Sequence, residues 1–273
     1  MLEDIVIRLP EFIQANAHLL QPPVCNKMIH NDGALRVMVV GGPNVRKDYH
    51  LNLGEELFYQ LRGNMVLKVM ESGQPKDIVI KEGDMFVLPA RIPHSPQRFE
   101  NTIGLVIERA RNPTELDGLR YYVDATNSEI LWERFFPVTN LGKQLVPLIE
   151  EFFSSEEYKT RQPSKPIPLS AWAEDEQTIL SSPFQLSSRF LNLADDEPPL
   201  HLFKKDFQVL LLGGESRTPP LPLESETWVW ILKGEAEVNG KRAVEGDTVL
   251  CTTALSSICL PPVSRVLLVY SVV

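Results

Sequence analysis

This sequence has few cysteines, a deficit of positive charge and no long apolar run. Its three cysteines, Cys25, Cys251 and Cys259, lack CxxC spacing, which predicts free thiols in a reducing cytosol. The 27 Lys and Arg against 36 Asp and Glu give a net charge of −9, which argues against a nucleic-acid or membrane-surface partner. No apolar run could span a bilayer, and the acidic residues near the start do not suit a signal peptide. We therefore expect a cytosolic protein that binds small molecules, not nucleic acid or membrane.

What remains favours a globular β protein. Apolar residues make up 43% of the chain, which is enough for a core, and 273 residues could form one large β domain or two smaller ones. Between Leu35 and Arg111, short apolar runs alternate with turns, which predicts an antiparallel sandwich or barrel. The runs span 34–42, 55–63, 64–70, 77–84, 84–90 and 104–111, and 121–138 continues the pattern. Residues 1–20 instead predict a short amphipathic helix that stops at Pro22–Pro23.

The β pattern is interrupted once and then returns. Apolar residues on one face predict a helix at 141–158, and a segment rich in charge and proline follows it. Further strand-like runs occupy the remainder of the chain. We therefore expect an all-β fold with a few helices and two jelly-roll barrels, with a catalytic domain at 1–158, a linker at 159–177 and a second domain at 178–273.

Two segments of the first half contain a candidate metal site. His50 and Glu56 are six residues apart and come just before a strand that ends at Gly63, while His94 follows Pro89 in a second segment. Two imidazoles and one carboxylate from adjacent barrel strands could occupy one face of a metal ion and leave the opposite positions open. That arrangement is typical of non-haem Fe(II) oxygenases. His50, Glu56 and His94 are therefore the predicted metal ligands, whereas His18, His30 and His201 suit structural or solvated roles.

Residues 228–250 parallel residues 57–88, so the second barrel resembles a weakened copy of the first. The alignment pairs Gly63 with Gly234, Gly83 with Gly246, Glu56 with Thr227, His94 with Ser257 and His50 with Leu221. The copy keeps the glycines that a barrel needs and loses all three candidate ligands. Glu226 and His201 are the only residues there that merit attention as functional candidates.

Charged residues near the candidate ligands point to the substrate. Arg46 lies four residues before His50 and Arg98 four residues after His94, so in extended segments both would share a face with the ligands. Two buried arginines need an anion, and a substrate carboxylate matches the planar guanidinium. Glu108, at the end of an apolar strand, could accept a proton or hydrogen bond from a substrate hydroxyl or amine. The alternatives are surface ion pairs for the arginines and a strand-end pair between Glu108 and Arg109 or Arg111.

The spacing of these residues resembles the two halves of the cupin signature. One departure is Asn52, which stands where most cupins have a second histidine of an H-x-H motif. A His/Glu/His triad leaves up to three positions open on an octahedral ion, room for a bidentate substrate and O₂ together. Across 41–65, 81–98, 105–111 and 116–124 the sequence closely resembles the 3-hydroxyanthranilate 3,4-dioxygenase family, in its animal-type form with two barrels in one chain.

The resemblance implies a cytosolic, monomeric Fe(II) enzyme of the route from tryptophan to NAD. Members open the ring of 3-hydroxyanthranilate with O₂, giving 2-amino-3-carboxymuconate semialdehyde, which closes spontaneously to quinolinate. It implies that His50, Glu56 and His94 bind iron, that Glu56 also contacts the bound substrate, and that O₂ binds at the iron near Arg46. It further implies that Arg46 and Arg98 bind the substrate carboxylate and that Glu108 contacts the substrate during catalysis.

Three other interpretations stay open from the residues alone. A metal-dependent isomerase of the phosphomannose type would share the barrel but use zinc and recognise phosphate. A non-catalytic binding cupin would not need the intact ligands and polar residues of the first half. A dioxygenase for another small aromatic compound or a thiol would use the same metal, because paired arginines indicate a carboxylate but do not identify the ring.

Overall fold

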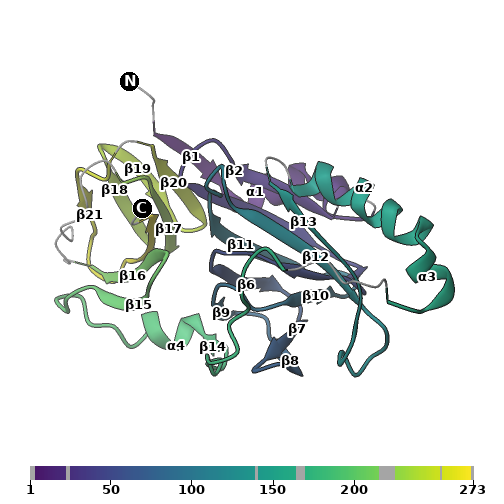
Figure 1. The fold of residues 1–273 in the computed structure, drawn as a ribbon. Helices are drawn as coiled ribbons and strands as arrows, with labels where there is room; N and C mark the ends of the chain where they lie inside the picture. The colour runs from purple at the N-terminus through teal and green to yellow at the C-terminus, as the bar shows by residue number, and fades with distance from the viewer. Residues whose placement is uncertain are drawn as a thin grey trace.

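The protein forms two β barrels that lie side by side, as the computed structural model shows (Figure 1). The structure describes residues 4–22, 25–138, 141–163, 170–214, 225–252 and 254–271. Strands dominate both halves, which confirms the predicted all-β fold with a few helices. Within the described part of the chain, no helix is long and apolar enough to cross a membrane.

The first barrel consists of two facing antiparallel sheets. One, here called the β10 sheet, contains in order β13 (Ile130–Pro137), β12 (Leu116–Tyr122), β5 (Tyr49–Leu51), β10 (His94–Arg98), β7 (Met65–Glu71) and β8 (Gln74–Ile80), with β4 (Asn44–Val45) also paired to β10. The other, the β11 sheet, contains β14 (Phe184–Gln185), β9 (Asp84–Leu88), β6 (Glu56–Arg62), β11 (Ile103–Arg109), β3 (Leu35–Gly41) and β2 (Asn26–His30). The predicted strands between Leu35 and Arg111 are confirmed, whereas β2, β4, β5 and β10 are not among the apolar runs that the sequence shows.

The second barrel has the same plan with fewer strands. Its large sheet, here called the β22 sheet, contains β1 (Ile5–Arg8), β20 (Asp247–Cys251), β17 (Thr227–Lys233), β22 (Arg265–Ser271), β16 (Phe207–Gly213) and β15 (Leu200–Lys204). Its small sheet contains β19 (Lys241–Val244), β18 (Glu235–Val238) and β21 (Ile258–Cys259). Thr227 begins β17 as Glu56 begins β6, which agrees with the alignment of the two halves.

Each barrel receives an edge strand from the other half of the chain. β1 pairs with β20, with Ile5 opposite Leu250, so the N-terminal segment completes the second barrel. β14 pairs with β9, with Phe184 opposite Met85, and so extends the first. The predicted domain boundaries at 158 and 177 stay a prediction. The two domains are not separate in the sheets, because each contributes a strand to the barrel of the other.

The expected N-terminal helix over residues 1–20 is wrong in its first part. Residues Ile5–Arg8 form β1, and helix follows only at α1 (Leu9–Ala15) and the short 3₁₀ helix η1 (Ala17–Leu19). The run Ile5-Val6-Ile7 has three β-branched side chains, which favour a strand when an open sheet edge is available. The sequence alone did not show that the second barrel offers such an edge.

The predicted helix at 141–158 is confirmed as α2 (Leu141–Ser154) followed by α3 (Glu156–Thr160). A further short helix, α4 (Leu186–Phe190), follows β14. α2 packs on the face of the β10 sheet that carries His50: the ring of Phe152 stacks on Tyr121 with centroids 3.6 Å apart, and Leu145 lines the same cavity as His50. In Figure 1, α2 and α3 lie at the end of the first barrel that faces away from the second.

Alternation along the β11 sheet separates a core from a site. Leu57, Leu105 and Ile107 pack against the β22 sheet in one large apolar cluster between the barrels. Their neighbours in sequence, including Glu56 and Glu108, point the other way because side chains alternate along a strand. The β11 sheet is therefore buried on both faces, and its inner face is free to carry polar groups toward the cavity of the first barrel.

Candidate metal centre and substrate cavity

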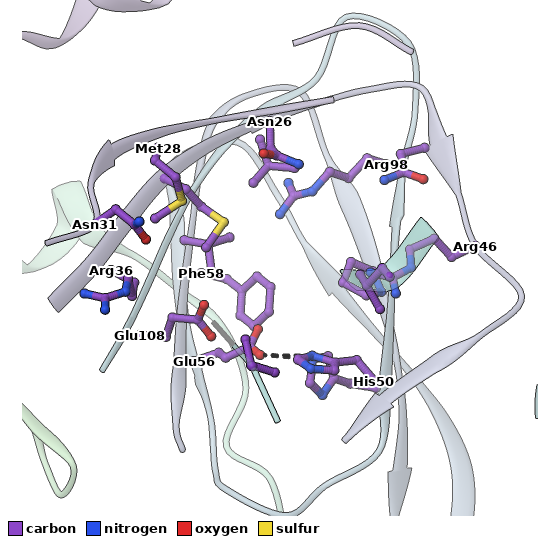
Figure 2. Close-up of a pocket in the computed structure, with 18 of the residues that line it drawn as sticks. Asn26, Met28, Asn31, Arg36, Arg46, His50, Glu56, Phe58, Arg98 and Glu108 are labelled. Atoms are coloured by element: carbon purple, nitrogen blue, oxygen red, sulfur yellow. Dashed lines mark ion pairs between the residues drawn. The ribbon is translucent and has the colours of Figure 1, made fainter. Parts of the chain in front are cut away.

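The three predicted metal ligands lie together inside the first barrel. His50 in β5 and His94 in β10 face each other across neighbouring strands. Glu56 approaches His50 from β6 in the opposite sheet (Figure 2). Glu56 Oε1 is 3.6 Å from His50 Nδ1 and 3.3 Å from His94 Nε2. One candidate ligand atom from each residue falls within 4.8 Å of the others, and all three side chains are buried. The geometry could hold a single metal ion.

Each candidate ligand has a partner that orients it. Ile92 O lies 3.0 Å from His94 Nδ1, which favours a proton there and leaves Nε2 free to bind a metal. Asp117 Oδ2 lies 2.8 Å from His50 Nε2, the carboxylate–histidine arrangement common at metal sites. Asn52 donates from Nδ2 to Glu56 Oε1 at 2.7 Å. The residue that departs from the cupin histidine therefore orients a candidate ligand.

The electrostatics of this cluster favour a cation. Burial opposes ionisation of Glu56, but the two histidines overcome it and hold the pKa of its carboxyl well below the ordinary value. Burial likewise opposes the charged form of His50, yet hydrogen bonds to Asp117 and Glu56 raise its pKa to about 9. The carboxylates thus stabilise positive charge at the cluster, from a proton or from a metal ion.

Both predicted arginines line one cavity of about 300 Å³ together with the ligand cluster. Arg98 is 2% exposed, and its guanidinium donates to Gln60 Oε1 at 2.9 Å. No carboxylate within the described ranges forms an ion pair with Arg98, and burial lowers the pKa of this arginine to about 10. A buried cation with a neutral partner is costly, so the position favours an anionic ligand.

A glycine makes room for this arginine. A Cβ at Gly104 would lie 2.4 Å from Gln60 Oε1 and 2.5 Å from Arg98 Nη1. Gly104 therefore lets Arg98 and Gln60 meet on the inner face of the sheet. From the sequence alone, this glycine was recognisable only as part of a strand.

Arg46 has a carboxylate partner of its own. Its Nε donates to Asp48 Oδ2 at 3.0 Å and its Nη2 forms a closer ion pair with the same oxygen. The alternative of an ordinary ion pair thus holds in part for Arg46, although its side chain also lines the cavity. Of the two predicted arginines, Arg98 is the one without a carboxylate partner in the part of the chain that the structure describes.

Glu108 lines the same cavity and is paired with Arg111. Arg111 Nη1 lies 2.6 Å from Glu108 Oε2, so the alternative interpretation of a strand-end pair also describes this residue. Arg111 Nη2 also lies 2.9 Å from Asp117 Oδ2, so a continuous chain of contacts links Glu108 to His50. Burial is the main influence on Glu108 and raises the pKa of its carboxyl.

Sequence reasoning missed the role of Asp117 and treated Arg111 only as a possible partner of Glu108. Asp117 follows Arg109 and Arg111 in a strand-like segment, and this was the only signal that the sequence offered. Nothing in the local sequence connects Asp117 with His50, which lies 67 residues earlier. Figure 2 shows Glu108 and Glu56 on one wall of the cavity and Arg46 and Arg98 on the other. Arg36 lies beside Glu108 in the same view and Arg111 pairs with Glu108, so positive and negative groups alternate around the cavity.

The other histidines lie outside this cluster. His18 is in η1 and His201 is exposed in β15, whereas His30 is buried in β2. In the part of the chain that the structure describes, no second group of His, Cys, Asp or Glu is arranged to hold a metal ion. Leu221, aligned with His50, lies outside the described residues. Glu226 does not point to a second site either, because its carboxylate accepts a hydrogen bond from Leu35 N.

The fold and the cluster together define a two-barrel cupin protein with a candidate metal centre in one barrel. Residues 1–153 match the family model of 3-hydroxyanthranilic acid dioxygenase. A 3-hydroxyanthranilate 3,4-dioxygenase of Nematostella vectensis is 50% identical over 233 residues, 84% of this chain and 84% of the relative. The Homo sapiens enzyme of the same name is 46% identical over 242 residues, 83% of this chain and 80% of the relative. The chain belongs to the 3-hydroxyanthranilic acid dioxygenase family.

Solved structures support the fold independently. A mutant of salicylate 1,2-dioxygenase from Pseudoaminobacter salicylatoxidans superimposes with a TM-score of 0.58 at 11% identity. The match covers 98% of this chain and 84% of that chain. Such a likeness extends over both barrels and concerns the fold alone.

Proposed function

We propose that this protein is an Fe(II)-dependent extradiol-type dioxygenase that converts 3-hydroxyanthranilate and O₂ to 2-amino-3-carboxymuconate semialdehyde. Family membership supports the reaction class. The observation that carries the proposal is the cavity itself, where a His/Glu/His cluster faces a buried arginine that has no carboxylate partner among the described residues. A small aromatic acid that chelates a metal with neighbouring hydroxyl and amine groups would satisfy both sides.

The donor set fits iron. Two imidazole nitrogens and one carboxylate oxygen are the ligands of non-haem Fe(II) sites, and the side of the cluster toward the cavity leaves room for exogenous ligands. His50, Glu56 and His94 would hold the ion, and the substrate would contact Glu56 beside it. When bound there, Fe(II) supplies O₂ binding, near Arg46, and electron transfer from ring to O₂. Both oxygen atoms enter the product, so no external reductant is required.

The protein side chains position the substrate and handle its proton. Arg98 would bind the carboxylate through its planar guanidinium, and Arg46 would assist while still paired with Asp48. Glu108 would accept the phenolic proton or hold the amine, and burial, which raises its pKa, makes it a better base than an exposed carboxylate. Catalysis by the protein is then largely orientation in a cavity shielded from water.

The wider role follows from that reaction and remains part of the proposal. The product would close spontaneously to quinolinate, which places the enzyme between tryptophan breakdown and NAD synthesis. We further propose that it acts in the cytosol as a monomer. Free cysteines support the first point: Cys25 and Cys251 are buried as thiols and Cys259 is exposed.

The test is anaerobic loading with Fe(II), followed by 3-hydroxyanthranilate in air, with near-UV absorbance and O₂ uptake recorded together. We expect one O₂ consumed per substrate and an absorbance rise from the muconate semialdehyde. Protein loaded with Zn(II) is the matched control and should show neither. Full iron loading without O₂ uptake would reject this substrate, and zinc in the purified protein together with no O₂ uptake would favour the isomerase.

2-Aminophenol, which is the substrate without its carboxylate, separates the remaining alternatives. It keeps the hydroxyl and amine that chelate the metal but offers nothing to Arg98. We expect kcat/KM at least about 10-fold below that for 3-hydroxyanthranilate, because an ionic hydrogen-bonded contact is lost. Equal turnover of both compounds would mean that the cavity does not recognise a carboxylate.

A further inference from the structure

Two carboxylates of the second barrel reach into the first barrel close to the candidate metal centre. The first belongs to Asp206, in the turn between β15 and β16. Glu55 N donates to Asp206 Oδ2 at 2.9 Å, and Asp206 N donates to Glu55 Oε2 at 3.0 Å. Arg109 Nε also donates to Asp206 Oδ2, at 3.3 Å. These three hydrogen bonds connect the two halves of the chain, and they are here called the Asp206 clasp.

The Asp206 clasp contacts the loop between His50 and Glu56, two of the candidate metal ligands. Residues 52–55 connect β5, which contains His50, to β6, which begins at Glu56. Arg109 Nη2 donates to Leu53 O at 3.3 Å, so the arginine bound by Asp206 also fixes the start of this loop. Glu55 is 4% exposed, and its backbone precedes Glu56 directly. Movement at Glu55 would therefore displace the Glu56 carboxylate.

The second carboxylate belongs to Glu226, just before β17. Its Oε1 accepts a hydrogen bond from Leu35 N at 2.9 Å, at the start of β3. Gly33 leaves space for this contact, since a Cβ there would lie 1.4 Å from Glu226 Oε2. A residue with a side chain at position 33 could not coexist with Glu226 in this place.

Both contacts meet the same end of the β11 sheet. Leu35, held by Glu226, pairs with Arg109, held by Asp206. Glu108, the residue before Arg109 in β11, pairs with Glu56 of the neighbouring strand β6. The second barrel thus contacts the β11 sheet at the residue pair next to Glu56 and Glu108, the two carboxylates that face the cavity.

We propose that Asp206 is a positioning residue through which the second barrel fixes the Glu56 loop for metal binding, and that Glu226 supports it by holding β3 beside β11. The proposal rests on the proposed function only in that Glu56 binds a metal. It gives the second barrel, which lacks ligands of its own, a direct role in the metal site. Metal sites lose affinity when the groups that orient their ligands are removed, by about 10- to 100-fold.

The probe is Co(II), titrated anaerobically into the full-length apoprotein and followed by its d–d absorbance. Asp206→Ala should weaken Co(II) binding about 10-fold, the lower end of that range, because Asp206 acts through the backbone. Asp206→Asn keeps an oxygen that can accept from Glu55 N but loses the charge that binds Arg109. Its affinity for Co(II) should therefore lie between those of the wild type and Asp206→Ala. Glu226→Ala should have a smaller effect, since it holds β3 and not the loop itself.

Asp195→Ala is the matched control. Asp195 also accepts from a backbone N–H, that of Val263 at 3.1 Å, and pairs with an arginine, Arg265, at 2.7 Å. All three residues belong to the second half of the chain, so this variant loses the same kinds of contact without touching the Glu56 loop. Thermal unfolding of each variant, measured without metal, shows that the titrations are done on folded protein.

The outcomes separate the two proposals. Wild-type protein that binds no Co(II) would reject the metal site, and with it the proposed function. Wild-type binding with unchanged affinity in folded Asp206→Ala would overturn the positioning role alone. The same loss in Asp195→Ala as in Asp206→Ala would also overturn it, because the effect would then be general destabilisation.

Discussion

The two barrels share one plan and differ in what fills them. In the first, Glu56 pairs with Glu108 across β6 and β11, and both face a cavity. In the second, the equivalent pair across β17 and β22 is Thr227 and Tyr270. The interior there is a continuous apolar cluster that includes Val229, Val249, Val266 and Leu268. One barrel holds charged groups around a space, and the other holds a packed core.

This difference shows what an open, charged interior requires. Buried charges are tolerated only when they are paired, and in the first barrel Arg111 links Glu108 to Asp117, which in turn binds His50. Arg98 is the exception, with a neutral partner only. The second barrel needs no such network, because its interior contains apolar side chains that are stable when buried. Its contribution is a packed support for the β11 sheet, which carries Glu56.

The largest effect should come from removing a candidate ligand. We expect His94→Ala to abolish stoichiometric metal binding and to lower turnover by at least about 10³-fold, since a bound metal supplies several kcal/mol of stabilisation. Ser257→Ala, at the aligned position of the second barrel, should change neither. Metal content by elemental analysis together with O₂ uptake checks both, and retained iron in His94→Ala would exclude the triad.

Removing the unpaired arginine should have the next largest effect. We expect Arg98→Ala to lower kcat/KM for 3-hydroxyanthranilate about 10²-fold, mostly through KM, because a buried charged contact is worth about 2–5 kcal/mol. Activity toward 2-aminophenol should change far less. The matched control is Arg265→Ala in the second barrel, where the buried arginine is paired with Asp195. This variant should lower the free energy of unfolding and leave KM unchanged. An unchanged KM in Arg98→Ala would reject the carboxylate anchor.

A smaller effect should distinguish packed core from cavity wall. Val229→Ala, in the apolar interior of the second barrel, should lower the free energy of unfolding by about 2 kcal/mol for two lost methyl groups and leave KM unchanged. Val106→Ala borders the cavity, so we expect a smaller loss of stability and an altered KM. Denaturant unfolding and steady-state kinetics measure the two quantities. Equal stability losses would mean that the cavity wall is packed as tightly as the core.

The smallest effect concerns acid stability. Burial lowers the pKa of His30 to about 4 from its ordinary value of 6.5, and its Nε2 has no hydrogen-bond partner among the described residues. The unfolded chain therefore binds a proton more readily, and the free energy of unfolding should fall as pH drops from about 6.5 through 4. Between pH 7 and 5.5 the loss should be about 1 kcal/mol.

His30→Leu should remove that pH dependence, as measured by urea unfolding at each pH. His201→Leu is the control in the second barrel: burial also lowers the pKa of His201, but this side chain is exposed and solvent screens it. A pH profile that is unchanged in His30→Leu would show that other groups cause the acid sensitivity.

Local sequence patterns were enough to specify the fold class, the two-barrel plan and the three residues of the candidate metal cluster. Alternating apolar runs and turn glycines are local signals, and they predicted β3, β6, β7, β9 and β11 well. The spacing of His50, Glu56 and His94 was recognisable because the chemistry of a metal site restricts its ligands to few residue types. The even offset of Arg98 from His94 holds within β10, and Arg46, which lies between β4 and β5, also lines the cavity.

The long-range contacts around that cluster became visible only in three dimensions. Asp117 contacts His50 across 67 residues, Asp206 contacts Glu55 across 151, and Glu226 contacts Leu35 across 191. Folding also assigns β1 to the second barrel, which made the expected helix at residues 5–8 wrong. A carboxylate has the same local pattern whether it faces water or a distant histidine. Its role is therefore set by the partner that folding brings beside it, and periodicity along the chain contains no information about that partner.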